Sequence, residues 1–183
     1  MQINIIACID KNGGLGYQNK LLFHIKKDME RFRMLTTGHT IIMGRKTYDS
    51  LPNGALPYRR NIVISHQDLN LPHCEIYHSM REALVACKND EVFVIGGASI
   101  YEQAMEIANK LYITKVEEES PNVDTYFPTI NQREWNIYAC DTFTERKSNR
   151  NKTFHYSFLT YKKSIKCPQE QREGGIFYPK QVL

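Results

Sequence analysis

Two apolar runs of the chain each end in glycine immediately before a stretch with helical character. Residues 39–43 lead into Gly44, and residues 91–95 lead into Gly96 and Gly97. Glycine lets the backbone approach a ligand closely, and the unpaired N–H groups at the start of the following helix attract anions. We call each of these strand–glycine–helix turns a glycine corner. Each corner alone is as consistent with an ordinary α/β turn as with a phosphate site, because neither matches the GxGxxG fingerprint. Together they predict a site that holds one dinucleotide.

The first corner also carries three donors in a row, Arg45, Lys46 and Thr47. This is more positive charge than a diphosphate requires, and it suits a further phosphate ester such as the 2′-phosphate of NADP. A hydrogen bond to a charged group contributes about 1.5 to 3 kcal/mol, so Arg45 alone could favour NADPH over NADH by roughly ten- to a hundredfold. The alternative interpretation is a solvated helix N-terminus.

The bulk composition is that of one soluble, well-buried domain. The chain has 183 residues, of which 42% are hydrophobic and 24% charged. Its net charge of +4 comes from basic residues scattered among nearly as many acids, which disfavours nucleic-acid binding. The cysteines are odd in number and widely spaced, with no CxxC pair, so they suggest neither a disulfide framework nor a metal site. A reducing cytoplasm fits this cysteine pattern best.

We expect no membrane association. The apolar residues 3–9 are followed at once by Asp10 and Lys11, which is typical of a first strand and not of a signal peptide. No apolar run approaches the roughly 20 residues that span a bilayer. A monomer is the default expectation for the oligomeric state.

Strand-like runs alternate with helical stretches, which predicts an α/β fold with a parallel sheet flanked by helices. We expect strands at residues 2–9, 39–43, 61–65, 73–77, 91–95 and 110–117, and helices at 25–36, 45–51, 79–88 and 98–107. After Pro128 the pattern changes to two long strands, residues 135–143 and 153–163, joined by a polar turn through 146–151. These two strands predict a C-terminal antiparallel hairpin.

The stretch around Asp28 places an acid on an apolar stripe. In helical spacing Asp28 shares a face with Ile25, Met29, Phe32 and Leu35. Burying an unpaired carboxylate costs several kcal/mol, so Asp28 needs an internal partner or a ligand that donates hydrogen bonds. A carboxylate facing an apolar slot can bind an amidine-like edge, such as that of a pterin, through two parallel hydrogen bonds.

Simpler interpretations of Asp28 and of Thr114 stay open. Asp28 can instead pair with Lys26, Lys27 or Arg31 on a wet helix face. Thr114, on the strand 110–117, can steady the carboxylate or donate to the ligand, but a lone strand threonine is more often structural.

With these pieces in this order, residues 1 to about 163 closely resemble dihydrofolate reductase. The resemblance rests on residues 13–21, 28–32, 42–47, 56–61, 95–97, 101, 111–114 and 124–128. It implies the dihydrofolate-reductase fold, in which a central, mostly parallel, eight-stranded sheet is flanked by helices and closed by the antiparallel hairpin. Residues 164–183 have no recognisable counterpart and form a predicted extension of unknown role.

The resemblance implies hydride transfer from NADPH to C6 of dihydrofolate, with protonation of N5, giving tetrahydrofolate for one-carbon metabolism. By the family pattern, Asp28 holds the 2-amino and N3 edge of the pterin and promotes protonation at N5 through water, and Thr114 supports this carboxylate. Arg59 takes the α-carboxylate of the glutamate tail, although it could be a plain surface charge. The remaining substrate contacts implied are Ile6, Phe32, Leu56 and Ile95.

The resemblance also implies a set of NADPH contacts. Around the nicotinamide they are Ala7, Cys8, Leu15, Gly16 and Asn19; around the adenosine phosphate, Gly44, Arg45, Lys46, Thr47, Ser65 and His66; and around the diphosphate, Gly96, Gly97, Ala98, Ser99, Ile100 and the adjoining Tyr101. Cys8 contributes through its backbone. Residues 13–16 belong to a mobile loop that closes over the nicotinamide.

The sequence departs from the family pattern at Phe23, where most bacterial relatives have tryptophan. Phenylalanine cannot donate the hydrogen bond that an indole N–H makes. Among antifolate inhibitors, we therefore expect diaminopyrimidines such as trimethoprim to bind more weakly than they bind typical bacterial relatives. Lys26 and Leu21 stand where proline and methionine are common in the family.

Two competing functions differ in their use of Asp28 and Arg59. A reductase of the same fold that acts on a riboflavin precursor would have no glutamate tail for Arg59 to bind. A non-catalytic NADPH-binding module would keep the glycine corners and leave Asp28 structural. Nucleic-acid binding, the third possibility, lacks a basic stripe.

Overall fold

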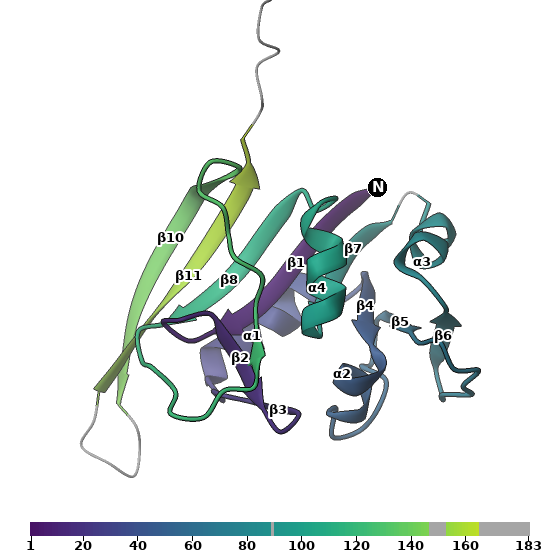
Figure 1. Cartoon of the computed structure of the whole chain (residues 1–183), viewed down its shortest axis with the longest axis horizontal. Helices are drawn as coiled ribbons and strands as arrows, with labels where there is room; N and C mark the ends of the chain where they lie inside the picture. Colours follow the sequence, from purple (N-terminus) through teal and green to yellow (C-terminus); the bar gives the residue numbers. More distant parts are fainter. Residues whose placement is uncertain (89, 147–152, 165–183) are drawn as a thin grey trace, which may run out of the picture.

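A computed structural model describes residues 1–88, 90–146 and 153–164. Its centre is an eight-stranded sheet of order β10-β11-β8-β1-β7-β4-β5-β6 (Figure 1). The strands are β1 (Gln2–Ile9), β4 (Thr40–Gly44), β5 (Arg60–Ile64), β6 (Cys74–Tyr77), β7 (Glu91–Gly96), β8 (Lys110–Val116), β10 (Trp135–Arg146) and β11 (Thr153–Lys163). The strands from β8 to β6 pair in parallel, whereas β11 and β10 add antiparallel at one edge. The predicted fold class is confirmed.

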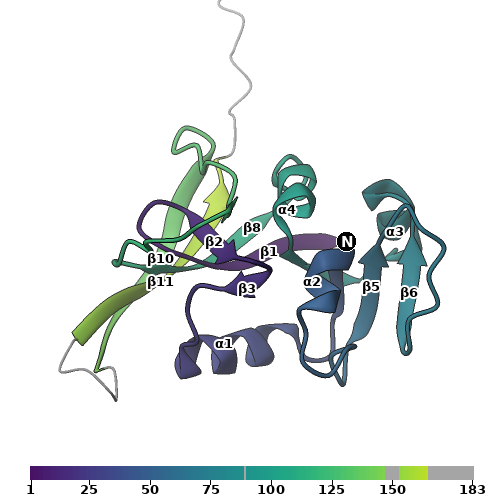
Figure 2. The same cartoon turned by 60° about the horizontal axis from the view of Figure 1, so that its bottom comes forward.

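Helices cover both faces of this sheet. Figure 2 shows α1 (Lys26–Thr36) on one side of the strands and α4 (Ala98–Met105) on the other. The remaining helices are the short α2 (Arg45–Asp49) and α3 (Met80–Ala86). Strand β1 is apolar on both faces, since Ile5 packs in the core under α4 while Ile6 packs in the core that Phe32 of α1 joins. Such two-sided burial is typical of central parallel strands.

A second sheet was not expected from the sequence. It contains three short strands in the order β3 (Lys20–Leu21), β2 (Gly14–Tyr17) and β9 (Thr125–Tyr126). The buried carboxylate of Asp10 organises the turn before β2, because it accepts hydrogen bonds from the backbone N–H groups of Asn12 (2.8 Å), Gly14 (2.7 Å) and Ser120 (3.1 Å). Residues 13–16, expected to belong to a loop, therefore lie largely in strand β2 of this small sheet, whose turn is held by Asp10.

The C-terminal hairpin is confirmed with one change of length. Strand β10 continues to Arg146, beyond its expected end at residue 143. Most of the predicted polar turn, and the extension after Ser164, lie outside the described residues. In the described ranges, no helix is long and apolar enough to cross a membrane.

Candidate active site

The two glycine corners predicted from the sequence lie side by side. Strands β4 and β7 are neighbours, and Met43 is paired with Gly96 in their register. A methyl group added to Gly44 would lie 3.1 Å from the side chain of Ile100 and 3.7 Å from the backbone nitrogen of Gly97. Because both strands are parallel, their carboxyl ends open at the same sheet edge, where α/β proteins bind ligands.

Thr47 lies against the second corner. A Cβ atom on Gly96 would be 3.2 Å from its Oγ1, and one on Gly97 would be 3.4 Å away. Gly96 has a φ of +128°, which favours glycine, and its peptide bond to Gly97 is cis. The N–H groups of Ile100 and Tyr101 already donate to the carbonyl of Gly97, so α4 begins directly at this corner. Ala98 and Ser99 form its first turn, with Ser99 exposed.

The donors of the first corner are held at the sheet edge. Arg45 donates through Nη1 to Gln67 Oε1 at 2.8 Å and forms an ion pair with Asp49 at 3.2 Å. Ser65 is buried at the end of the neighbouring strand β5, and His66 beside it is exposed. Guanidinium, hydroxyl and imidazole groups around a glycine turn are a donor set that fits a phosphate ester, so these residues fit NADP.

The β2–β3 sheet reaches this corner through Asn19. Its side-chain Nδ2 donates to the backbone carbonyl of Lys46 at 3.0 Å. Leu15 is buried in the main core, and Gly16 has no room for a side chain, because a Cβ would lie 2.8 Å from the carbonyl oxygen of Lys20. The predicted nicotinamide-side and phosphate-side residues therefore belong to one continuous region.

Three of the predicted substrate and nicotinamide contacts, Ile6, Ala7 and Cys8, lie in the second half of β1. The hydroxyl of Tyr101 is buried and donates to the carbonyl of Ile6 at 2.8 Å. Burial raises the pKa of both the Tyr101 hydroxyl and the Cys8 thiol, and the neighbouring Asp28 charge adds to this rise. Cys8 is thus a neutral thiol and no nucleophile.

Asp28 is buried on the sheet-facing side of α1, with 7% of its surface exposed. Thr114 Oγ1, from β8, donates to Asp28 Oδ1 at 2.5 Å. Burial raises the pKa of Asp28, whereas the Thr114 hydrogen bond and the charge of Arg31 lower it. The expectation of a buried acid is confirmed, and Thr114 is its partner.

Part of the predicted helix face is wrong. Met29 is 38% exposed, because it follows Asp28 by one residue and turns away from the sheet. Lys26 pairs with Glu30 at the surface, and Lys27 lies over the ring of Phe143. The alternative of a wet ion pair between Asp28 and these lysines does not hold.

An apolar cluster extends along α1 away from Asp28. Four predicted substrate residues, Ile6, Phe32, Leu56 and Ile95, belong to one cluster on this face of the sheet. Arg59 closes the far end, where its Nε donates to Thr36 Oγ1 at 2.8 Å and its Cζ lies 5.8 Å from the Phe32 ring centre. Asp28 and Thr36 are separated by about 12 Å along the helix axis. The structure therefore places the acid and the arginine near opposite ends of α1, with the apolar cluster along the same helix.

Asn61 holds the loop that carries Leu56 and Arg59, a role that sequence reasoning missed. Its buried side chain accepts from the Leu56 N–H at 2.8 Å and donates to the carbonyls of Leu56 and Arg59, both at 2.9 Å. The one available signal was a polar residue at the start of the apolar strand β5.

We expect Asn61→Ala to destabilise the fold by about 1 to 3 kcal/mol, since it leaves part-buried backbone groups of this loop without these hydrogen bonds. Urea denaturation measures the change in the free energy of unfolding. Asn136→Ala is the matched control, because it removes one exposed hydrogen bond, to Ser164, and should change stability by less than about 0.5 kcal/mol. Equal losses in the two variants would contradict the anchoring role of Asn61.

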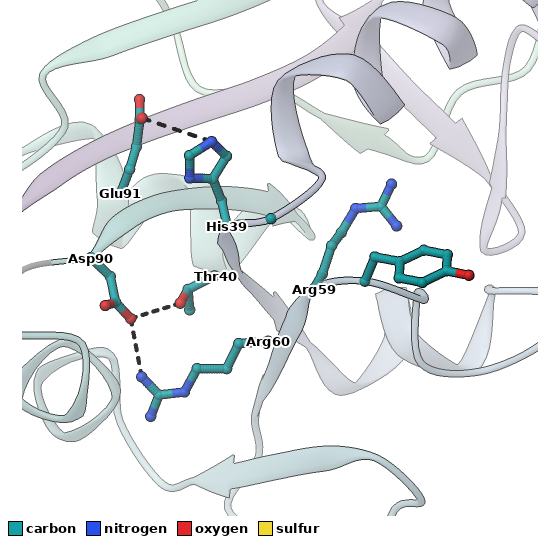
Figure 3. Close-up of a pocket in the computed structure, with 8 residues that line it drawn as sticks. His39, Thr40, Arg59, Arg60, Asp90 and Glu91 are labelled. Carbon is teal, nitrogen blue, oxygen red and sulfur yellow. Dashed lines mark hydrogen bonds and ion pairs between the residues drawn. The ribbon is translucent and has the colours of Figure 1, made fainter.

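A pocket of about 400 Å³ opens at the amino ends of β4, β5 and β7, away from the glycine corners (Figure 3). Two pairs of its side chains contact each other: Arg60 forms an ion pair with Asp90 at 3.1 Å, and His39 Nε2 lies 4.0 Å from Glu91 Oε2. Arg59 lines one side and points away from these pairs. These contacts within the pocket indicate a structural cluster, so the candidate site is the region of Asp28, Arg59 and the apolar cluster along α1.

Comparison with known proteins gives consistent matches over nearly the whole chain. A family model described as dihydrofolate reductase matches residues 2–163. The chain is 36% identical over 176 residues to dihydrofolate reductase of Bacillus subtilis (strain 168), covering 95% of this chain and 99% of that one. It is 40% identical over 163 residues to dihydrofolate reductase of Neisseria gonorrhoeae, covering 88% and 98%.

A solved structure is similar in fold. Dihydrofolate reductase from Enterococcus faecalis, complexed with NADP(H) and RAB-propyl, matches with a TM-score of 0.79 at 24% identity, covering 90% of this chain and 97% of that one.

Proposed function

Because this chain belongs to the dihydrofolate reductase family, we propose that it reduces 7,8-dihydrofolate to 5,6,7,8-tetrahydrofolate with NADPH, and that Asp28, Arg59 and the apolar cluster along α1 bind the substrate. The observation that carries the proposal is the buried Asp28, hydrogen-bonded by Thr114, with an apolar cluster along α1 and with Arg59 near the other end of this helix. When bound, NADPH supplies the hydride that C6 of the pterin receives. The product would serve one-carbon metabolism and thymidylate synthesis in the cytoplasm, and we propose that the enzyme acts as a monomer.

Asp28 is the group that binds and orients the pterin. An ionised carboxylate accepts two parallel hydrogen bonds, from the 2-amino group and from N3. Thr114 occupies Oδ1 from the β8 side and so fixes the plane of the carboxylate. By stabilising positive charge on the bound ring, Asp28 promotes protonation at N5, with a water molecule delivering the proton.

Arg59 is the group that distinguishes a folate from other pterin-like or pyrimidine substrates. Its guanidinium donates to Thr36 Oγ1 (2.8 Å), Thr37 Oγ1 (3.2 Å) and the carbonyl of Pro57 (2.8 Å), which holds the fork rigid. These contacts leave N–H groups over for a carboxylate. A glutamate tail extending along α1 from a pterin held at Asp28 would bring its α-carboxylate to this point, which favours a folate over a riboflavin precursor.

The glycine corners and the β2–β3 sheet bind and enclose the cofactor. Gly96 and Gly97 let the backbone come close to the diphosphate, Gly44 does the same at the adenosine phosphate, and the guanidinium of Arg45 donates to the 2′-phosphate. Residues 13–16, tethered by Asp10, would close over the nicotinamide and exclude water from the reacting atoms.

The direct test is the loss of NADPH absorbance when dihydrofolate is added, with NADH in parallel. We expect rapid oxidation of NADPH and little oxidation of NADH. Binding of NADPH without oxidation would favour the non-catalytic module, and oxidation with a ribosylated aminopyrimidine instead would favour the riboflavin-type reductase.

We expect Arg45→Gln to reduce the preference for NADPH over NADH by roughly ten- to a hundredfold, because it removes charge-assisted hydrogen bonds to the 2′-phosphate. The ratio of kcat/KM for the two cofactors measures this preference. Arg81→Gln, an exposed charge on α3, is the control and should leave the ratio unchanged. If both variants lowered the ratio alike, the effect would come from net charge and not from a contact.

Phe23→Trp should tighten binding of trimethoprim. Phe23 packs on the Ile25 and Tyr156 cluster beside Cys8, and an indole N–H there adds one donor, worth roughly two- to tenfold in the inhibition constant. Phe23→Leu adds no donor and is expected to bind the inhibitor no more tightly than the native protein. An inhibition constant that fails to fall in Phe23→Trp would count against the hypothesis.

A further inference from the structure

Arg31 lies one turn after Asp28 on α1 and reaches the same hydrogen-bond system. Its Nη1 is 3.4 Å from Thr114 Oγ1, the atom that donates to Asp28. The guanidinium is half-buried, with its Cζ 4.5 Å from the ring centre of Phe158 and 5.7 Å from that of Tyr112. These aromatic faces hold a positive charge close to the buried carboxylate.

The direction of the Thr114 hydroxyl follows from this contact. An arginine has donors and no acceptor, so Thr114 can only accept from Arg31 and must direct its own proton elsewhere. Asp28 Oδ1, at 2.5 Å, receives it. Hydrogen bonds in such a series polarise one another in a low-dielectric interior, which strengthens the bond to the carboxylate.

We propose that Arg31 is a positioning residue for Asp28: it orients the Thr114 hydroxyl toward the carboxylate and supplies the positive charge that keeps this carboxylate ionised and able to accept two hydrogen bonds. The inference rests on the proposed function in one respect, namely that Asp28 is the acid that binds the substrate.

The other groups around Asp28 do not supply this charge. Cys8 from β1, Tyr101 from α4 and Tyr156 from β11 all have a raised pKa, chiefly through burial, with that of Tyr156 at about 12. They are therefore neutral in the physiological range. Lys26 points to solvent with 86% of its side chain exposed.

Arg31 has neighbours of its own on the strands. Burial lowers the pKa of Arg31, and the negative charges of Asp28 and of Asp141 on β10 oppose this fall. An arginine keeps its proton in such surroundings. Arg31 thus remains a cation at every pH at which Asp28 titrates.

The test is a carbon-13 NMR titration of the aspartate side-chain carboxyls in the full-length protein without ligands. Asp28→Asn identifies the Asp28 signal by its disappearance. We expect Arg31→Met to move the titration midpoint of this signal to higher pH, because burial raises the pKa of Asp28 and the positive charge of Arg31 would no longer lower it. Arg31→Lys, which keeps the charge, should restore part of the shift, and Lys26→Met, which removes an exposed charge from the same helix, should leave the midpoint at its native value.

A native midpoint in a folded Arg31→Met protein would overturn the proposal and reduce Arg31 to a packing role over Phe158. If Arg31→Met does not fold, Arg31→Gln removes the charge while keeping a polar group, and the same comparison applies. Because the titration uses neither cofactor nor substrate, its outcome is independent of whether the protein reduces dihydrofolate. An enzyme without turnover would refute the proposed function and leave the Arg31 result standing.

Discussion

Asp28→Asn is expected to lower turnover at pH 7 by about 10² to 10⁴-fold while NADPH binding stays intact. Asparagine keeps an oxygen that can accept from Thr114, which donates to Asp28 at 2.5 Å, but it carries no negative charge to stabilise a protonated pterin. Activity should recover partly under acidic conditions, where the substrate arrives already protonated. Steady-state rates across pH 5–8, with NADPH affinity measured separately, test both parts.

The same variant should not lose stability. Burial raises the pKa of Asp28 in the folded state, so the folded protein binds the proton more tightly than the unfolded chain does. Stability therefore falls as the pH rises through this pKa, because a buried carboxylate must ionise. Asparagine does not ionise, so the midpoint temperature of thermal denaturation of Asp28→Asn at pH 7 should be no lower than that of the native protein.

A matched control separates the role of this acid from charge loss in general. Asp68 has a fully exposed side chain near His78, and Asp68→Asn should leave turnover at its native rate. Unchanged turnover of Asp28→Asn at pH 7 would remove Asp28 from the mechanism and favour the non-catalytic module.

The main sheet could be predicted because its strands are local patterns. Apolar runs that end in glycine, such as 91–95 before Gly96 and Gly97, identify both the strand and the corner that follows it. The pairing of β4 with β7, which brings the two corners together, is not a local pattern. It was inferred only because one dinucleotide needs both corners.

The parts that escaped prediction depend on contacts between distant segments. The strands β2, β3 and β9 are two to four residues long, and Asp10 fixes their turn through a bond to Ser120 more than a hundred residues away. Similarly, the helical spacing predicts that Asp28 lies on a buried face but leaves open which residue it meets. The contacts of Arg31 with the rings of Phe158 and Tyr112 join α1 to distant strands and are not visible in a local pattern.

Gly96→Ala is expected to abolish measurable NADPH binding in the range that saturates the native protein. Gly96 has a φ of +128°, where a side chain is strained by about 1 to 3 kcal/mol. Its new Cβ would also lie 3.2 Å from Thr47 Oγ1 and 3.4 Å from the Tyr101 hydroxyl. Thr47, in the cofactor corner, must give way by a few tenths of an ångström, whereas the Tyr101 hydroxyl, which donates to Ile6, would be in ordinary van der Waals contact. Fluorescence titration with NADPH and urea denaturation measure the two effects separately.

Gly38→Ala separates the backbone strain of a positive φ from the contacts that a new Cβ makes with neighbouring atoms. Gly38 also has a positive φ, +84°, but a Cβ there would meet no atom within 4 Å. Both variants should therefore lose stability, while only Gly96→Ala should lose NADPH affinity. If Gly38→Ala bound NADPH as poorly as Gly96→Ala, general loosening of the fold would explain the defect. If Gly96→Ala kept native affinity, the diphosphate would not approach the backbone at this corner, and the dinucleotide would have to lie elsewhere along the sheet edge.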